Sequence, residues 1–153
     1  MPGVGLEVVL AAIALATPAA PAGQLGCIPG RPAALLVAYE RTGGFAGIRE
    51  ELRVFRGGQA TLDHARGGQS TFRLTCRRVQ TLRDRLVQAR FATLAPVYAP
   101  EDVINDGFID TVSYAGRRVR VLTGARPPER LARVLGILRS IASNRRLSAA
   151  APG

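Results

Sequence analysis

The stretch LLVAYERTGGFAGIREELRVF, residues 35–55, carries the clearest structural signal in the chain. Its first part, residues 35–39, is an apolar run typical of a central strand. Its last part, residues 48–55, alternates between an apolar face, which Glu50 interrupts, and a face of Arg and Glu. Three glycines lie between the two parts, and glycine tolerates the positive φ that tight turns need. The stretch therefore predicts a β-hairpin with a looped tip.

A weak echo follows this hairpin. The string GGQATL at residues 57–62 recurs as GGQSTF at residues 67–72. The spacing predicts two further strands, near 59–64 and 70–75, in a β-meander. Two copies are too few to make a repeat protein.

The next segment changes to helical spacing. Val79, Leu82 and Leu86 recur among arginines, which predicts an amphipathic helix over 77–91 with Thr75 as its N-cap. Residues 92–107 contain two prolines and end in Asn-Asp-Gly, and are expected to form a loop.

A second hairpin is expected where residues 108–114 and 117–123 flank Ala-Gly. A two-residue turn there pairs Tyr114 with Arg117 and Asp110 with Val121. One face of this hairpin is then mostly apolar, with Asp110 as the exception, and the other face is polar and expected to be wet.

The last helix is expected to begin at Pro127-Pro128-Glu129 and to end near Asn144, followed by a disordered tail over 145–153. Together these elements predict a single α+β domain over 34–144. An antiparallel sheet of about five to six strands, with two helices packed on one face, buries every apolar stripe.

The N-terminus resembles a bacterial signal peptide. Val8 to Ala16 is an apolar run that is too short to span a bilayer, and residues 20–22 form an A-x-A cleavage site. We expect a signal peptide over 1–22, a flexible Gly- and Pro-rich leader over 23–33, and a secreted, periplasmic or cell-envelope protein without stable membrane insertion. The alternative is an apolar tail on a cytoplasmic protein.

The chain has two cysteines, Cys27 and Cys76. In an exported protein, such a pair predicts one disulfide that ties the leader to the middle of the domain. In a reducing compartment the two would instead remain unpaired thiols.

The charge favours acidic partners. Lys and Arg number 21, all of them Arg, against 11 acidic residues, which gives a formal net charge of +10. The predicted elements place the arginines on helix exteriors and one sheet face, without the aromatic platform that nucleic-acid modules use. We therefore expect no nucleic-acid partner, and a solvated basic surface is the plain alternative to any binding role.

The sequence offers little for catalysis. His64 is the only histidine, and we expect it on the surface. No nucleophile with a base, no credible set of zinc ligands and no phosphate-cradling loop is evident. We predict a protein that is not an enzyme and holds no cofactor or metal.

What remains is surface recognition, and Phe45 is the candidate. It is a large aromatic residue between glycines at a hairpin tip, where an exposed side chain can anchor a partner. The alternative is that Phe45 folds back over the edge of the sheet and the glycines serve only the turn.

At this loop the string YERTGGFAGI, residues 39–48, resembles the signature of the emfourin family. Emfourin is a protein inhibitor of protealysin, a thermolysin-like zinc metalloprotease. A second similarity is DGF, residues 106–108, at the start of a strand that leads into a hairpin and a terminal helix. The order of elements matches over residues 35–144. The family usually has an aromatic residue two positions after the second Phe, where this chain has Asp110.

The resemblance implies a tight, noncovalent inhibitor of a secreted thermolysin-like metalloprotease. Export is expected from the signal peptide, and we expect a monomer. Our hypothesis places the loop 43–47 at the active-site cleft of the protease, with Phe45 in the pocket for the bulky apolar residue after the cut bond. The expected partner-binding residues are Gly43, Gly44, Phe45, Ala46 and Gly47. The alternative function is a noncatalytic basic module that binds the cell envelope or assists secretion.

Overall fold

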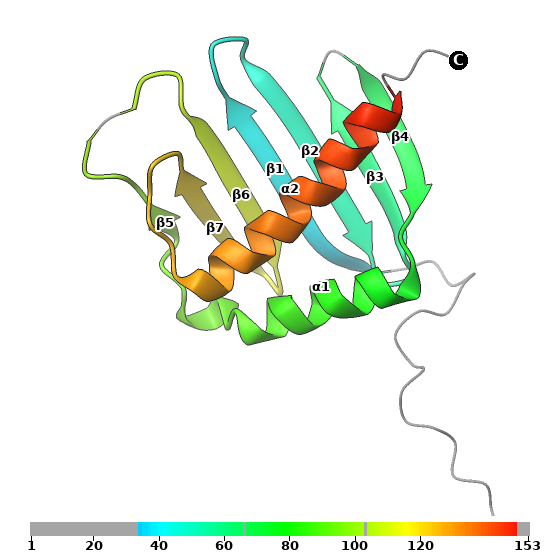
Figure 1. Cartoon of the computed structure of the whole chain (residues 1–153). Helices are drawn as coiled ribbons and strands as arrows, with labels where there is room; N and C mark the ends of the chain where they lie inside the picture. The colour runs from blue at the N-terminus through cyan, green and yellow to red at the C-terminus, as the bar shows by residue number, and fades with distance from the viewer. Residues whose placement is uncertain (1–33, 66, 103, 150–153) are drawn as a thin grey trace, which may run out of the picture.

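The computed structural model describes residues 34–65, 67–102 and 104–149. These form an α+β fold in two layers, a twisted sheet and two helices that cross one of its faces (Figure 1). The elements are β1 Leu35–Gly43, β2 Ile48–Phe55, β3 Gln59–His64, β4 Gly68–Arg73, α1 Cys76–Gln88, the 3-10 turn η1 Phe91–Thr93, β5 Val97–Tyr98, β6 Phe108–Tyr114, β7 Arg117–Leu122 and α2 Glu129–Ala149.

The strand order is β4-β3-β2-β1-β6-β7-β5, so the strand predicted to be central lies in the middle of the sheet. The predicted fold class is confirmed, but the strand count and the purely antiparallel pairing are wrong. The sheet has seven strands and is mixed, because β5 pairs with β7 in parallel. This two-residue strand lies inside the segment 92–107, expected to be a loop, where it is too short to show any periodicity.

Both predicted hairpins are present, and the second has the predicted register. Gly43 faces Ile48 at the end of the first hairpin. Tyr114 faces Arg117 and Asp110 faces Val121 in the second. A register shift near the start of β1 explains why consecutive residues there are apolar, since it lets both Leu36 and Val37 become buried.

The core lies between the sheet and the two helices. The Thr75 hydroxyl accepts a hydrogen bond from the Arg78 N–H at 3.3 Å, as the predicted N-cap requires. The apolar stripe of each helix is buried against the sheet. In α1 it consists of Val79, Leu82 and Leu86, and in α2 of Leu131, Val134, Leu135, Leu138 and Ile141.

The ends of the helices differ from expectation. Helix α1 ends at Gln88 rather than near residue 91, because Arg90 adopts a left-handed conformation with φ 51°. Helix α2 continues to Ala149, so the predicted disordered tail is wrong for residues 145–149. This segment has no Gly or Pro to stop the helix, and Arg, Leu and Ala favour its continuation. Residues 150–153 lie outside the described residues.

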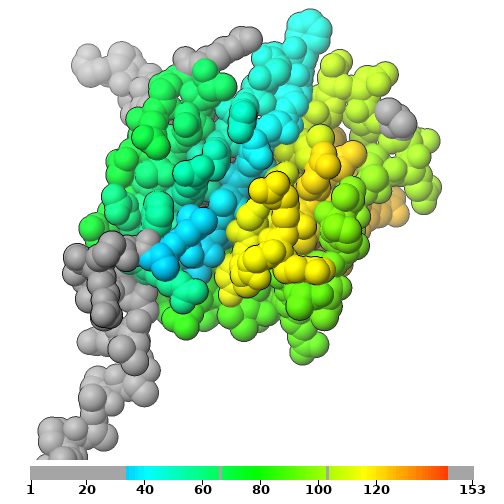
Figure 2. All heavy atoms as spheres, turned by 180° about the vertical axis from the view of Figure 1, so that it is seen from behind, coloured from blue at the N-terminus to red at the C-terminus, as the bar shows by residue number. Residues whose placement is uncertain are grey.

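The opposite face of the sheet carries no helix in the described part of the chain, and its strands lie side by side in Figure 2. Arg118 and Arg120 of β7 are exposed on this face, as the alternation predicts. None of the described helices is both long and apolar enough to cross a membrane. The predicted signal peptide, its cleavage site and the leader lie outside the described residues.

Candidate partner-binding loop

The five residues predicted to bind a partner form the tip of the β1–β2 hairpin. The Gly47 N–H donates to the Gly44 carbonyl at 2.9 Å, which closes a β-turn with Phe45 and Ala46 at its centre. Gly43, Gly44 and Gly47 all have positive φ, at 113°, 74° and 58°. The Phe45 side chain is 95% exposed. It does not fold back over the sheet, so the alternative placement of Phe45 is wrong.

The tip is braced by the second motif, DGF. Gly43 of β1 faces Phe108 of β6, and the Gly44 N–H donates to the Gly107 carbonyl at 3.1 Å. Gly44 lies against the Phe108 ring so closely that an added Cβ would be 2.8 Å from the ring. On the same ring, the Arg41 guanidinium carbon lies 4.2 Å from the centroid, in a cation–π contact. The structure therefore brings together the two motifs that carry the family resemblance.

A hollow of about 400 Å³ lies beside this brace. The β5–β6 loop, the start of β6 and the end of β7 line it, with Phe108 among the lining residues. Ile104 of the same loop is an exposed large apolar residue. The hairpin tip and this loop share one end of the molecule (Figure 1). The sequence did not indicate that the β5–β6 loop lies beside the hairpin tip, because only the pairing of β1 with β6 places residue 107 beside residue 44.

Behind the tip, four charged residues form a row across the sheet, which we call the charged row. Neighbouring strands pair His64 with Glu50, Glu50 with Arg41, and Arg41 with Asp110. Basic and acidic side chains alternate along the row. Glu50 and Asp110 are buried, at 1% and 3% exposure. The Arg41 Nε lies 4.0 Å from Asp110 Oδ1, and the His64 Nδ1 lies 3.5 Å from Glu50 Oε1.

Asp110, at one end of the charged row, is hydrogen-bonded to two other elements. Its Oδ1 accepts a hydrogen bond from the Tyr39 hydroxyl, with 2.5 Å between the two oxygens, and its Oδ2 accepts one from the Arg139 guanidinium of α2. Burial, then the hydrogen bond to Asp110, raises the pKa of Tyr39. Burial opposes the charge of Arg139, but its bond and attraction to Asp110 outweigh this and raise its pKa. Asp110 thus ties α2 to the two strands that support the tip.

The sequence missed the charged row, although it contained a signal. Glu50 and Asp110 each interrupt an otherwise apolar face, and buried acids require partners. The pairing of Glu50 with Arg41 belongs to the first predicted hairpin. Placing His64 beside Glu50 and Arg41 beside Asp110 requires the β2–β3 and β1–β6 registers, which the separate hairpins do not contain. His64, expected on the surface, is half-buried beside Glu50.

Other sequence predictions stay open. In the described ranges, no group of three or more His, Cys, Asp or Glu residues could hold a metal ion. Cys76 is the first residue of α1, whereas Cys27 lies outside the described residues, so the disulfide remains a prediction. The absence of enzymatic activity also remains a prediction.

Comparison with known proteins gives no assignment: no protein-family model matches the chain, and no curated protein matches it. The candidate site therefore depends on its own geometry and on the resemblance of its two motifs.

Proposed function

We propose that this protein is an exported inhibitor of a thermolysin-like zinc metalloprotease. It binds noncovalently, with the loop 43–47 in the active-site cleft and Phe45 in the pocket for a bulky apolar side chain. The observation that carries the proposal is the 95% exposure of Phe45 on a tip that Gly107 and Phe108 brace from below.

The brace matters because a preformed loop loses little conformational entropy when it binds. A closed turn, a backbone hydrogen bond and a ring packed against Gly44 all restrict the tip before any partner arrives. Restriction also opposes cleavage, since a loop that cannot adapt to the protease releases its cut ends slowly. Exposed Ile104, at the same end of the molecule, adds apolar surface for the rim of the cleft.

The test is inhibition of a thermolysin-like protease by the chain from residue 23 to 153, over a concentration series. Phe45→Ala should weaken inhibition by about 2–4 kcal/mol, or roughly 30-fold to 800-fold in the inhibition constant, as expected for a central anchor. Val87→Ala is the matched control, because Val87 is also exposed and apolar but lies on α1. It should leave the inhibition constant unchanged.

Each result separates the alternatives. An unchanged inhibition constant for Phe45→Ala would contradict the role of the loop. Progressive cleavage of the chain would identify a substrate rather than an inhibitor. If several such proteases, including one from the source organism, were not inhibited, the alternative of a basic cell-envelope or secretion-accessory module would be favoured.

A further inference from the structure

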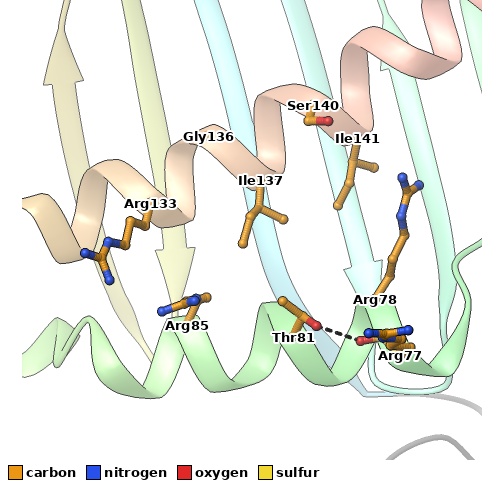
Figure 3. Close-up of a pocket in the computed structure, with 9 residues that line it drawn as sticks. All are labelled: Arg77, Arg78, Thr81, Arg85, Arg133, Gly136, Ile137, Ser140 and Ile141. Atoms are coloured by element: carbon orange, nitrogen blue, oxygen red, sulfur yellow. Dashed lines mark hydrogen bonds between the residues drawn. The ribbon is translucent and has the colours of Figure 1, made fainter.

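A second surface lies between the two helices, away from the hairpin tip. Helices α1 and α2 border a groove of about 570 Å³ (Figure 3). This volume is in the range of sites that accept a few side chains of a ligand. The sequence pattern predicts a solvated helix exterior for its arginines.

The rim of the groove is strongly basic. Arg77, Arg78 and Arg85 line it from α1, and Arg133 lines it from α2. Arg133 is paired with Glu129 one turn earlier in α2. Within residues 34–65, 67–102 and 104–149, no carboxylate forms an ion pair with the three arginines of α1. The rim therefore has uncompensated positive charge.

Two of these arginines are at a position where positive charge destabilises a helix. Arg77 and Arg78 occupy the first turn of α1, which contains no acidic residue. The N-terminus of a helix carries partial positive charge, so cations there are unfavourable and anions are favourable. A bound carboxylate would relieve this conflict and interact with both arginines.

The floor of the groove is apolar. Ile137 and Ile141 of α2 point toward α1 (Figure 3), where Ile137 is only half-buried. Gly136 is exposed, and no heavy atom lies within 4 Å of the position that a Cβ would take. The open space beside Gly136 leaves room for the side chains of another chain.

We propose that this groove docks an acidic, amphipathic segment of a partner protein. Apolar side chains of the segment rest on Ile137 and Ile141, and its carboxylates pair with the arginines of α1. An apolar floor with a charged rim is the arrangement by which grooves bind amphipathic segments. The charge complementarity selects an acidic partner. This proposal is independent of protease inhibition.

The experiment measures binding of a labelled synthetic helical peptide, with Leu on one face and Glu on the other, to the full chain by fluorescence anisotropy. Arg77→Glu with Arg78→Glu should weaken binding about tenfold or more. Gly136→Leu should weaken it similarly without any change in charge, because the new side chain fills the groove and Leu favours helix. The control pair, Arg118→Glu with Arg120→Glu, makes the same charge change on the opposite sheet face and should have an effect below about threefold.

Three outcomes would overturn the proposal. The first is equal weakening by the two charge-reversal pairs. The second is unchanged binding to Gly136→Leu. The third is equally tight binding of polyglutamate, which would indicate a nonspecific polyanion surface. Phe45→Ala should bind the peptide as the unmodified chain does, and the groove variants should still inhibit the protease, so the two proposals can fail separately.

Discussion

Two carboxylates, Glu50 and Asp110, are buried in the sheet, at 1% and 3% exposure. An ionised acid without partners is costly to bury, and removing one partner of a buried pair costs several kcal/mol. Asp110 has Tyr39 and Arg41 of β1 and Arg139 of α2 around it. A one-residue slip of β1 would remove both Tyr39 and Arg41 from this face. The charged row therefore fixes the register of the strands that carry the binding loop.

Tyr39→Phe tests whether the partners of buried Asp110 stabilise the fold. The variant should lower the free energy of unfolding by about 1–2 kcal/mol at neutral pH, because it deletes a hydrogen bond to a buried acid. The pKa of Tyr39 is raised above its ordinary value of 10.0. As pH rises above about 10, the unfolded chain therefore loses this proton first, and the stability present at lower pH is progressively lost.

The variant lacks this phenol, so its stability should fall less than that of the unmodified chain above about pH 10. Urea unfolding followed by circular dichroism, from neutral to alkaline pH, measures the difference. Two curves that stay parallel over this range would show that Tyr39 is not the group responsible.

At the scale of the element, the β1–β2 hairpin depends on glycines that differ in their surroundings. A Cβ at Gly43 would lie 2.3 Å from the Gly107 carbonyl oxygen, a backbone atom, at a φ of 113°. Gly43→Ala must therefore displace the DGF segment as well as strain its own backbone. We expect a loss of about 2–3 kcal/mol in stability and weaker inhibition, since the brace under the tip moves.

Gly47→Ala is the matched control for this prediction. Gly47 also has positive φ, at 58°, but no atom lies within 4 Å of an added Cβ. Its cost should be limited to backbone strain of about 1 kcal/mol, with Phe45 still presented. Chemical denaturation and inhibition constants of both variants provide the comparison. Equal losses would mean that contact with Gly107 does not hold the loop.

The same elements show how far the sequence predicts this fold. The two hairpins and helix α1 could be predicted from alternation, short turns and the cap at Thr75, because each of these signals depends on residues close in sequence. β5 was not predicted, because its two residues form a strand only by pairing with β7. The contact of Gly44 with Phe108 and the partners of Asp110 depend on the β1–β6 pairing, which no local pattern encodes.

At the scale of the whole molecule, the two proposed binding surfaces, the hairpin tip and the arginine groove, are separate. The hairpin tip and the β5–β6 loop share one end, whereas the arginine groove lies between the helices (Figure 1). Further arginines are exposed on the open face of the sheet, as at Arg118 and Arg120. Positive charge thus lies in the groove and on the open sheet face, apart from the apolar anchor Phe45. The charge and the anchor should affect different rate constants in binding to an acidic partner: the charge the association rate, and the anchor the dissociation rate.

Steering by the net charge of +10 should make association with an acidic protease strongly dependent on salt. Between about 0.1 M and 1 M salt the Debye length falls from about 10 Å to about 3 Å. The association rate should therefore drop about tenfold or more, with little change in dissociation. Surface plasmon resonance over a salt series measures both rates.

Two variants separate charge from anchor in the same measurement. Arg118→Glu with Arg120→Glu lowers the net charge from +10 to +6, because each exchange removes two units, and should slow association at low salt. Phe45→Ala leaves the charge intact and should speed dissociation while keeping the salt dependence, because the lost contacts form only after the encounter. An association rate insensitive to both salt and charge reversal would remove steering from the mechanism and leave the fit of Phe45 to determine affinity.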